Sequence, residues 1–143
     1  MSFGESIKTV FSKYATFSGR ARRSEYWFWA LFQTIVYVVV SFVAGPMMAS
    51  GINIQTGEIG GAYFGGAALI GLVGLAFLLP NLAVVVRRLH DQDKPGPFIF
   101  LGLIPGVGGI IILVLMLLEG TRGPNQFGPD PKAPADAQAP AQA

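Results

Sequence analysis

The side chains best suited to acid–base or metal chemistry lie in one short stretch, RRLHDQDKPG at residues 87–96. His90 and Asp91 are adjacent and Asp93 follows, so one imidazole and two carboxylates could bind a divalent cation or move a proton. His90 is the only histidine, however, and three bases flank the two acids. Such sets usually form helix-end salt bridges and turn caps, so we expect neither a metal site nor catalysis here.

Other kinds of reaction find little support. The chain has no cysteine, which excludes disulfides, thiolate metal sites and a cysteine nucleophile. No glycine-rich phosphate loop follows a strand, and Ser24 and His90 are not part of a visible serine–histidine–acid set. We therefore expect no catalytic residue and no cofactor; an enzyme at the membrane interface that uses His90 and Asp91 is an alternative.

The distribution of charge indicates the elements that position these residues. Of ten Lys and Arg residues, five precede Glu25, three lie between Arg87 and Lys94, and none lies between Arg23 and Arg87. The chain is 52% hydrophobic and 13% charged, whereas about a quarter of residues are charged in soluble domains. The basic residues flank apolar runs, which is typical of a membrane protein and argues against a nucleic-acid partner.

Three apolar runs predict an all-α, small polytopic membrane protein with three transmembrane helices, over residues 26–44, 62–86 and 98–118. The first would cover about 28 Å at 1.5 Å per residue, close to the ~30 Å hydrocarbon core of a bilayer. Tyr26 and Trp27 mark its interface, and Gly45-Pro46 closes it. Pro80 predicts a kink in the second.

The third run contains the sequence IPGVGG at its centre. We expect one transmembrane helix kinked at Pro105. A re-entrant hairpin is the alternative, but its arms would reach only half of the core and leave backbone groups in lipid without partners.

An amphipathic helix is predicted before the first run. Apolar residues share one face of residues 3–17: Phe3, Ile7, Val10, Phe11 and Tyr14. This helix would lie in the headgroup plane, or alternatively pack on the cytoplasmic face of the protein. Residues 1–131 would then form a single integral-membrane domain. The Ala/Pro/Gln-rich residues 132–143 are expected to be disordered.

The positions of the basic residues also predict topology. The N-terminus and residues 87–94 would be cytoplasmic, and residues 45–61, with no base, would be outside. Three crossings would leave the C-terminal tail outside, which the charges of Arg122 and Lys132 oppose. A hairpin in the third run would return the tail to the cytoplasm.

Three polar clusters carry a family resemblance: FSGRARRSEYW at 17–27, RRLHDQDKPG at 87–96 and EGTRGPNQFGPDP at 119–131. In this order they resemble the bacterial inner-membrane family catalogued as domain of unknown function 805, the YhaH-like proteins, over Tyr14 to Pro131. Two features depart from that pattern: Pro95-Gly96-Pro97-Phe98 replaces a Ser-Gly-Trp type sequence, and the loop after the first run is long. The resemblance implies a multi-pass protein of the inner membrane and no particular reaction.

The first two clusters would meet at the cytoplasmic interface. We expect Glu25 to pair with Arg87 or Arg88 and so to fix how two helices meet. An anionic lipid headgroup or phosphate, held with the help of Arg22 and Lys94, is the alternative. The charge cluster comprises Arg20, Arg23, Glu25, Arg87, Arg88, His90 and Asp91, and the C-terminal turn motif comprises Asn125, Gly128, Asp130 and Pro131.

These features predict a non-catalytic protein that acts by association with itself, anionic lipid or another membrane protein. Glycines and alanines of residues 61–74 would let helices approach closely, either within the chain or in a homo-oligomer. A small channel or transporter component is the alternative. The absence of charged side chains from the predicted spans counts against it.

Overall fold

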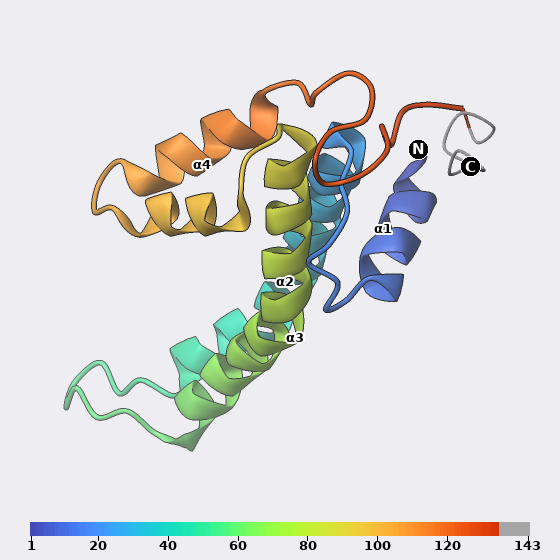
Figure 1. Cartoon of the computed structure of the whole chain (residues 1–143). Helices are drawn as coiled ribbons and strands as arrows, with labels where there is room; N and C mark the ends of the chain where they lie inside the picture. Colours follow the sequence, from blue (N-terminus) through green and yellow to red (C-terminus); the bar gives the residue numbers. More distant parts are fainter. Residues whose placement is uncertain (135–143) are drawn as a thin grey trace. The chain divides into compact units, whose positions relative to one another are not determined.

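The computed structural model describes residues 1–134, which contain helices and no strand. Figure 1 shows α1 (Phe3–Ser12), α2 (Arg23–Ser50), α3 (Gly61–Asp91) and α4 (Gly108–Leu117), with a 3-10 helix, η1 (Gly96–Leu103), before α4. The all-α prediction is confirmed. The predicted disordered tail lies, from residue 135 onward, outside the described residues.

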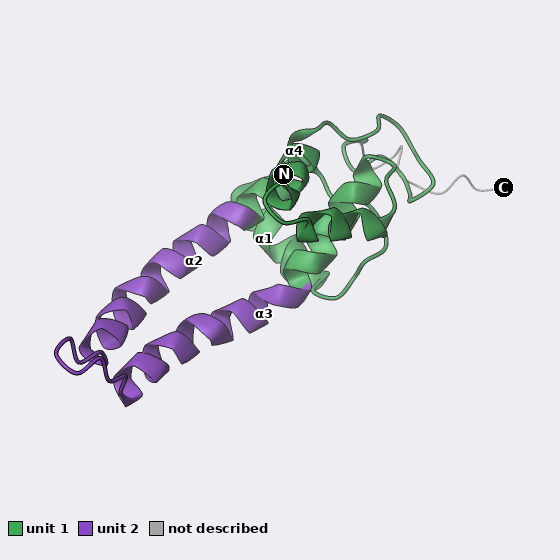
Figure 2. Cartoon of the chain, turned by 90° about the vertical axis from the view of Figure 1, so that its left-hand side faces the viewer, with its two compact units in different colours: residues 1–29, 80–143 green, residues 30–79 purple. Residues whose placement is uncertain are grey.

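Two compact units make up the chain (Figure 2). Among the described residues, one unit comprises residues 1–29 and 80–134, and the other comprises residues 30–79. A single integral-membrane domain over residues 1–131 therefore stays a prediction.

Two helices are long and apolar enough to cross a bilayer. α2 has 28 residues and α3 has 31, or about 42 and 46 Å at 1.5 Å per residue. In the most apolar 18-residue window of each, only 11% of residues in α2 and 22% in α3 are buried. Their apolar side chains therefore face outward, unlike those of a core helix in a soluble protein.

Both helices extend beyond the predicted spans. α2 continues through Gly45 and Pro46 to Ser50, because a proline removes only one backbone donor and flanking hydrogen bonds persist. α3 includes Pro80 and continues to Asp91, which places the motif at residues 87–91 in its last turns.

The glycines of α3 allow close packing against α2 within residues 30–79. A Cβ atom added at Gly66 would lie 2.6 Å from the carbonyl oxygen of Ala44 and 2.6 Å from Cγ of Met48. Phe77 of α3 contacts the rings of Phe32 and Tyr37, with centroids 6.0 and 6.1 Å away. Ala44 and Met48 of the same chain therefore occupy the surface around Gly66.

The third apolar run departs from prediction. It is not one helix kinked at Pro105: η1 and α4 are separate, lie side by side and are joined by a turn (Figure 1). Gly106 in this turn has a φ of 82°, a left-handed conformation that glycine adopts without steric cost. A Cβ at Gly108 would collide with the backbone of Gly102, so glycine also permits the close approach.

α1 is shorter than predicted and packs on the start of α2. Ser2 and Glu5 form a capping box at its N-terminus. Phe3 contacts Phe28 and Phe11 contacts Trp29 edge to face, with ring centroids 5.9 and 5.2 Å apart. Phe11 remains 44% exposed, so the helix keeps an outward apolar face.

Candidate functional site

A buried charge network lies where α3 ends. Its members come from the segment before α2, the first turn of α2 and the last turns of α3. Each is at most 9% exposed: Arg20, Glu25, Arg87, Arg88, His90 and Asp91. Charged residues that are more than sixty positions apart in the sequence therefore lie together in the fold.

The two adjacent arginines of α3 have different partners. Arg87 donates to Glu25 Oε1 over 2.5 Å. Arg88 donates instead to Asp91 and to the carbonyl of Leu118. Successive side chains on a helix point about 100° apart, so each arginine reaches a different neighbour.

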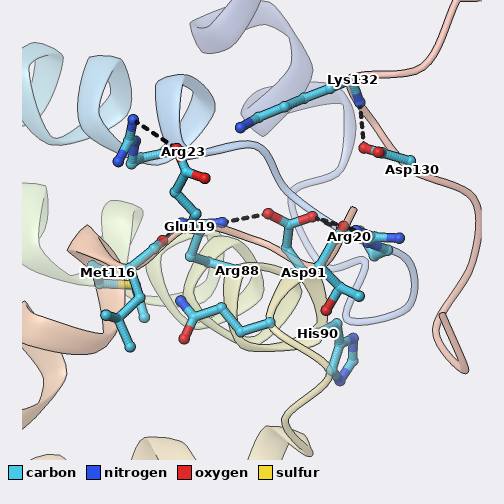
Figure 3. A network of polar contacts seen from close by, with 12 residues as sticks. Arg20, Arg23, Arg88, His90, Asp91, Met116, Glu119, Asp130 and Lys132 are labelled. Carbon is cyan, nitrogen blue, oxygen red and sulfur yellow. Dashed lines mark hydrogen bonds and ion pairs between the residues drawn. The ribbon is translucent and has the colours of Figure 1, made fainter. Parts of the chain in front are cut away.

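Asp91 lies between two guanidinium groups. Figure 3 shows its carboxylate between Arg88 and Arg20. The distance from Arg20 Nη2 to Asp91 Oδ1 is 3.0 Å, and both side chains are almost fully buried. A buried carboxylate needs such compensation, because desolvation disfavours its charged form.

Arg20 also binds the segment after α4. Its Nη1 donates to the carbonyls of Gly123, over 2.6 Å, and Gly128, over 3.3 Å, and its Nη2 donates to Thr121 over 2.5 Å. The Thr121 N–H in turn donates to the carbonyl of Asp91 over 2.6 Å. The guanidinium therefore holds residues 121–128 against the end of α3.

The His90 ring is enclosed. It stacks on Phe127 with ring centroids 4.0 Å apart and planes 2° apart. Its Nδ1 lies 3.0 Å from the carbonyl of Gly19, so this nitrogen carries the proton and donates. Asn125 Nδ2 donates to the His90 carbonyl over 2.9 Å. Residues 1–134 contain no group of three side chains suited to binding a metal ion.

The end of α4 is docked on the same network. The last four carbonyls of a helix lack partners within it. Here each accepts a hydrogen bond from a side chain: Leu115 from Gln92, Met116 from Trp27, Leu117 from Arg23 and Leu118 from Arg88. Distant segments thus complete the helix end.

The helix end also explains the charge balance of the network. Three buried arginines, Arg20, Arg87 and Arg88, face two buried carboxylates. The C-terminus of a helix carries about half a negative charge, which offsets part of the excess.

The Arg87 guanidinium is not fully hydrogen-bonded. Its Nε and Nη2 atoms have no hydrogen-bond partner among residues 1–134.

The C-terminal motif forms a turn against this network. Asn125 and Gly128 exchange backbone hydrogen bonds of 3.0 and 3.1 Å, with Gly128 at a φ of 137°. Asp130 accepts hydrogen bonds from the backbone N–H groups of Lys132 and Gly123, both over 2.9 Å. These bonds lower the pKa of Asp130. Pro131 follows directly, in the same turn region.

Arg23 lies at the rim rather than in the buried network. Its side chain is 45% exposed, and its guanidinium is 4.0 Å from Glu119, which is 61% exposed. Sequence reasoning missed the roles of Gln92, Trp27 and Phe127. No local pattern marks them, because they act on carbonyls or a ring contributed by distant segments.

Two long outward-facing apolar helices and a buried ionic end define a helical protein of the membrane-spanning type. The family described as "Protein of unknown function (DUF805)" matches residues 14–129, and the chain belongs to it. The predicted resemblance is therefore confirmed.

Curated relatives are similar over most of their length. "Inner membrane protein YhaI" of Escherichia coli (strain K12) is 36% identical over 124 residues, covering 87% of this chain and 92% of the relative. "Inner membrane protein YhaH" of the same organism is 39% identical, with 86% and 93% covered. "Uncharacterized protein YiiR" is 30% identical, with 80% and 85% covered. No solved structure matches the chain.

Proposed function

We propose that this chain is a non-catalytic protein of the bacterial inner membrane that acts by association with itself, anionic lipid or another membrane protein. The names of the relatives support this location. The observation that carries the proposal is the internal use of the charged motifs. Arg20, Arg88 and Asp91 bind one another and the carbonyls of residues 118–128, so they hold the fold rather than face a substrate.

The proposed topology has two crossings, by α2 and α3. The two ends of the third apolar segment lie close to each other. Gln92, before η1, donates to the carbonyl of Leu115 near the end of α4, and Arg88 donates to the carbonyl of Leu118. Residues 119–134 then lie with the N-terminus in the cytoplasm. All ten Lys and Arg residues fall on the cytoplasmic side in this arrangement, which the positive-inside rule favours.

The hairpin of η1 and α4 would enter the cytoplasmic half of the bilayer. Its arms have 8 and 10 residues, or about 16 and 15 Å, half of the ~30 Å core. Large apolar side chains point outward from both arms: Phe100 is 65% exposed, Leu103 76% and Ile110 62%. Lipid would cover them.

Two alternatives find less support. An enzyme using His90 and Asp91 would need these groups to be accessible, but His90 is covered by Phe127 and Asp91 by two arginines. A channel or transporter component would be expected to have ionisable groups along its path. Residues 26–86 contain one charged side chain, Glu58, in the loop between α2 and α3.

Thiol labelling tests the topology, because the chain has no native cysteine. Single cysteines at the exposed positions Ser12, Gln55 and Gln126 would be treated with a membrane-impermeant maleimide in spheroplasts and in inverted vesicles. Ser12→Cys and Gln126→Cys should react only in inverted vesicles, and Gln55→Cys only in spheroplasts. Reaction of Gln126→Cys from outside would establish a third crossing and reject this topology.

Purification from native membrane in mild detergent tests the association. Co-purified lipids and proteins would be identified by mass spectrometry. If anionic lipid is a partner, Arg22→Gln, Arg23→Gln and Lys94→Gln together should reduce bound cardiolipin or phosphatidylglycerol. Lys8→Gln with Lys13→Gln is the control for basic residues outside the cluster. Recovery without a second copy, an anionic lipid or a protein partner would reject association.

A further inference from the structure

Three hydroxyl-bearing side chains form a stripe along the middle of α2. Thr34, Tyr37 and Ser41 are spaced by three and four residues and therefore share one face. With Val38 and Phe42 they line a shallow groove of about 480 Å³. The groove lies wholly within residues 30–79, far from the charge network in sequence.

Two of these hydroxyls lack a partner within the described chain. Thr34 Oγ1 donates to the carbonyl of Ala30 over 2.9 Å, as hydroxyls on membrane helices commonly do. Tyr37 and Ser41 make no side-chain hydrogen bond to residues 1–134.

The Tyr37 ring is held in place by α3. Its plane lies at 81° to that of Phe77. Its phenol oxygen lies near Gly74 of α3, because a Cβ atom added there would be 3.5 Å away, an ordinary van der Waals distance. The ring, held in this way, is one of the side chains that line the groove.

These groups are costly if α2 crosses the bilayer, a premise that rests on the proposed function. Tyr37 lies 14 residues from one end of α2 and 13 from the other, at the depth of the hydrocarbon core. Water is absent at that depth, and acyl chains have no hydrogen-bonding groups. Another polar helix face can supply a hydrogen bond.

We propose that a second copy of this chain packs on the groove formed by Thr34, Tyr37, Val38, Ser41 and Phe42. Hydroxyls both donate and accept, so the face is complementary to itself across a two-fold axis along the membrane normal. Val38 and Phe42, 51% and 78% exposed, supply the apolar packing around the polar contacts. The face has no charge that would select a different partner.

α3 is less suited to this contact. The glycine surface around Gly66 is already filled by Ala44 and Met48 of the same chain. Gly71 of the predicted Gly/Ala-rich second span has open space around it, but residues 64–79 contain no polar side chain that needs a partner. We therefore place the contact on α2.

Cysteine cross-linking in native membranes tests the proposal. Val38→Cys and Ser41→Cys should form disulfide-linked dimers with a lipid-soluble copper–phenanthroline oxidant. Val39→Cys, at the same depth of α2 and 60% exposed, and Leu75→Cys on α3, 67% exposed, are matched controls and should stay monomeric. Failure of both groove positions, or equal linking at Val39, would overturn the proposal.

Hydroxyl removal provides a second test that leaves side-chain size nearly unchanged. Tyr37→Phe in the Val38→Cys background should reduce cross-linking about threefold, the modest effect expected of a hydrogen bond between membrane helices. Undiminished linking would show that the phenol does not contribute, and a monomeric protein would show that lipid fills the groove. If labelling of Ser12, Gln55 and Gln126 still reports two crossings, the dimer alone is rejected and the proposed topology stands.

Discussion

The guanidinium of Arg87 and the carboxylate of Glu25 lie 2.5 Å apart, and both side chains are buried. They join the end of α3 to the start of α2. Removing only one partner of such a buried ion pair is costly, because the remaining charge stays buried without its partner.

A double-mutant cycle should therefore show coupling between these two residues. Glu25→Gln and Arg87→Gln should each destabilise the protein by about 3–5 kcal/mol, and the double variant should recover about 0.5–3 kcal/mol of the summed loss. Unfolding would be followed in detergent by denaturant titration. The exposed pair Arg23 and Glu119 is the control cycle, with coupling of about 1 kcal/mol or less. Additive losses at Glu25 and Arg87 would contradict the pairing.

Asp91 should be more important for stability than its neighbour Asp93. Asp91 compensates both Arg20 and Arg88, so Asp91→Asn should cost about 3–5 kcal/mol and release residues 119–134 to protease. Asp93 is exposed and has a φ of 59°, a conformation that asparagine adopts well. Asp93→Asn should leave stability within about 0.5 kcal/mol of the parent. Equal effects of the two changes, in thermal unfolding and proteolysis, would count against the network.

The charge pattern indicated part of this site before the fold was known. Unpaired charge is expensive near lipid, which limited the partner of Glu25 to Arg87 or Arg88. Choosing between them requires the rotation of α3 relative to α2. That rotation is set by packing contacts such as Trp29 Nε1 to Asn81 Oδ1, 2.7 Å apart, and no local sequence signal encodes it.

The error over residues 98–118 has a different cause. IPGVGG permits either a kink or a reversal, and in the structure Gly106 has a positive φ in the turn that reverses the chain. What stabilises the returning arm is remote: Gln92, Trp27 and Arg88 complete the carbonyls at the end of α4. The sequence analysis expected backbone groups of a hairpin to lack hydrogen-bond partners, because the donors that reach the end of α4 lie in other segments.

Gly120 should tolerate no side chain. A Cβ atom there would collide with the carboxylate of Asp91, which two arginines hold in place. Gly120→Ala should destabilise the protein by about 1–3 kcal/mol. Gly109→Ala, in the same unit and with open space around the added atom, should be neutral or slightly stabilising because alanine favours helix. Thermal unfolding of the two variants side by side checks this, and equal stability would contradict the close contact.

The turn around Asp130 should loosen in acid. Backbone hydrogen bonds from Lys132 and then Gly123 hold the pKa of Asp130 below its usual 3.8. A lowered pKa in the folded state means that the contribution to stability is present above pH 3.8 and is lost as the pH falls through the folded value. Protection of these two amides from hydrogen exchange, corrected for intrinsic rates, should fall in that window. Asp130→Asn should remove the pH dependence, and a parent-like profile in this variant would contradict the assignment.

Spin labels should distinguish a hairpin from a third crossing. Leu103 and Leu117 are 76% and 51% exposed and lie at the turn end of η1 and the far end of α4. In inverted vesicles, with an impermeant nickel chelate outside, a label on Leu117→Cys should collide often with the chelate because α4 returns to the cytoplasmic surface. A label on Leu103→Cys should lie deeper, at about 10–15 Å, and collide more with oxygen than with nickel. Gln126→Cys, in an exposed turn, and Val39→Cys, in mid-helix, calibrate the two extremes. In a third crossing Leu117 would lie in the opposite leaflet, beyond reach of the chelate, so a nickel-inaccessible Leu117 would contradict the hairpin.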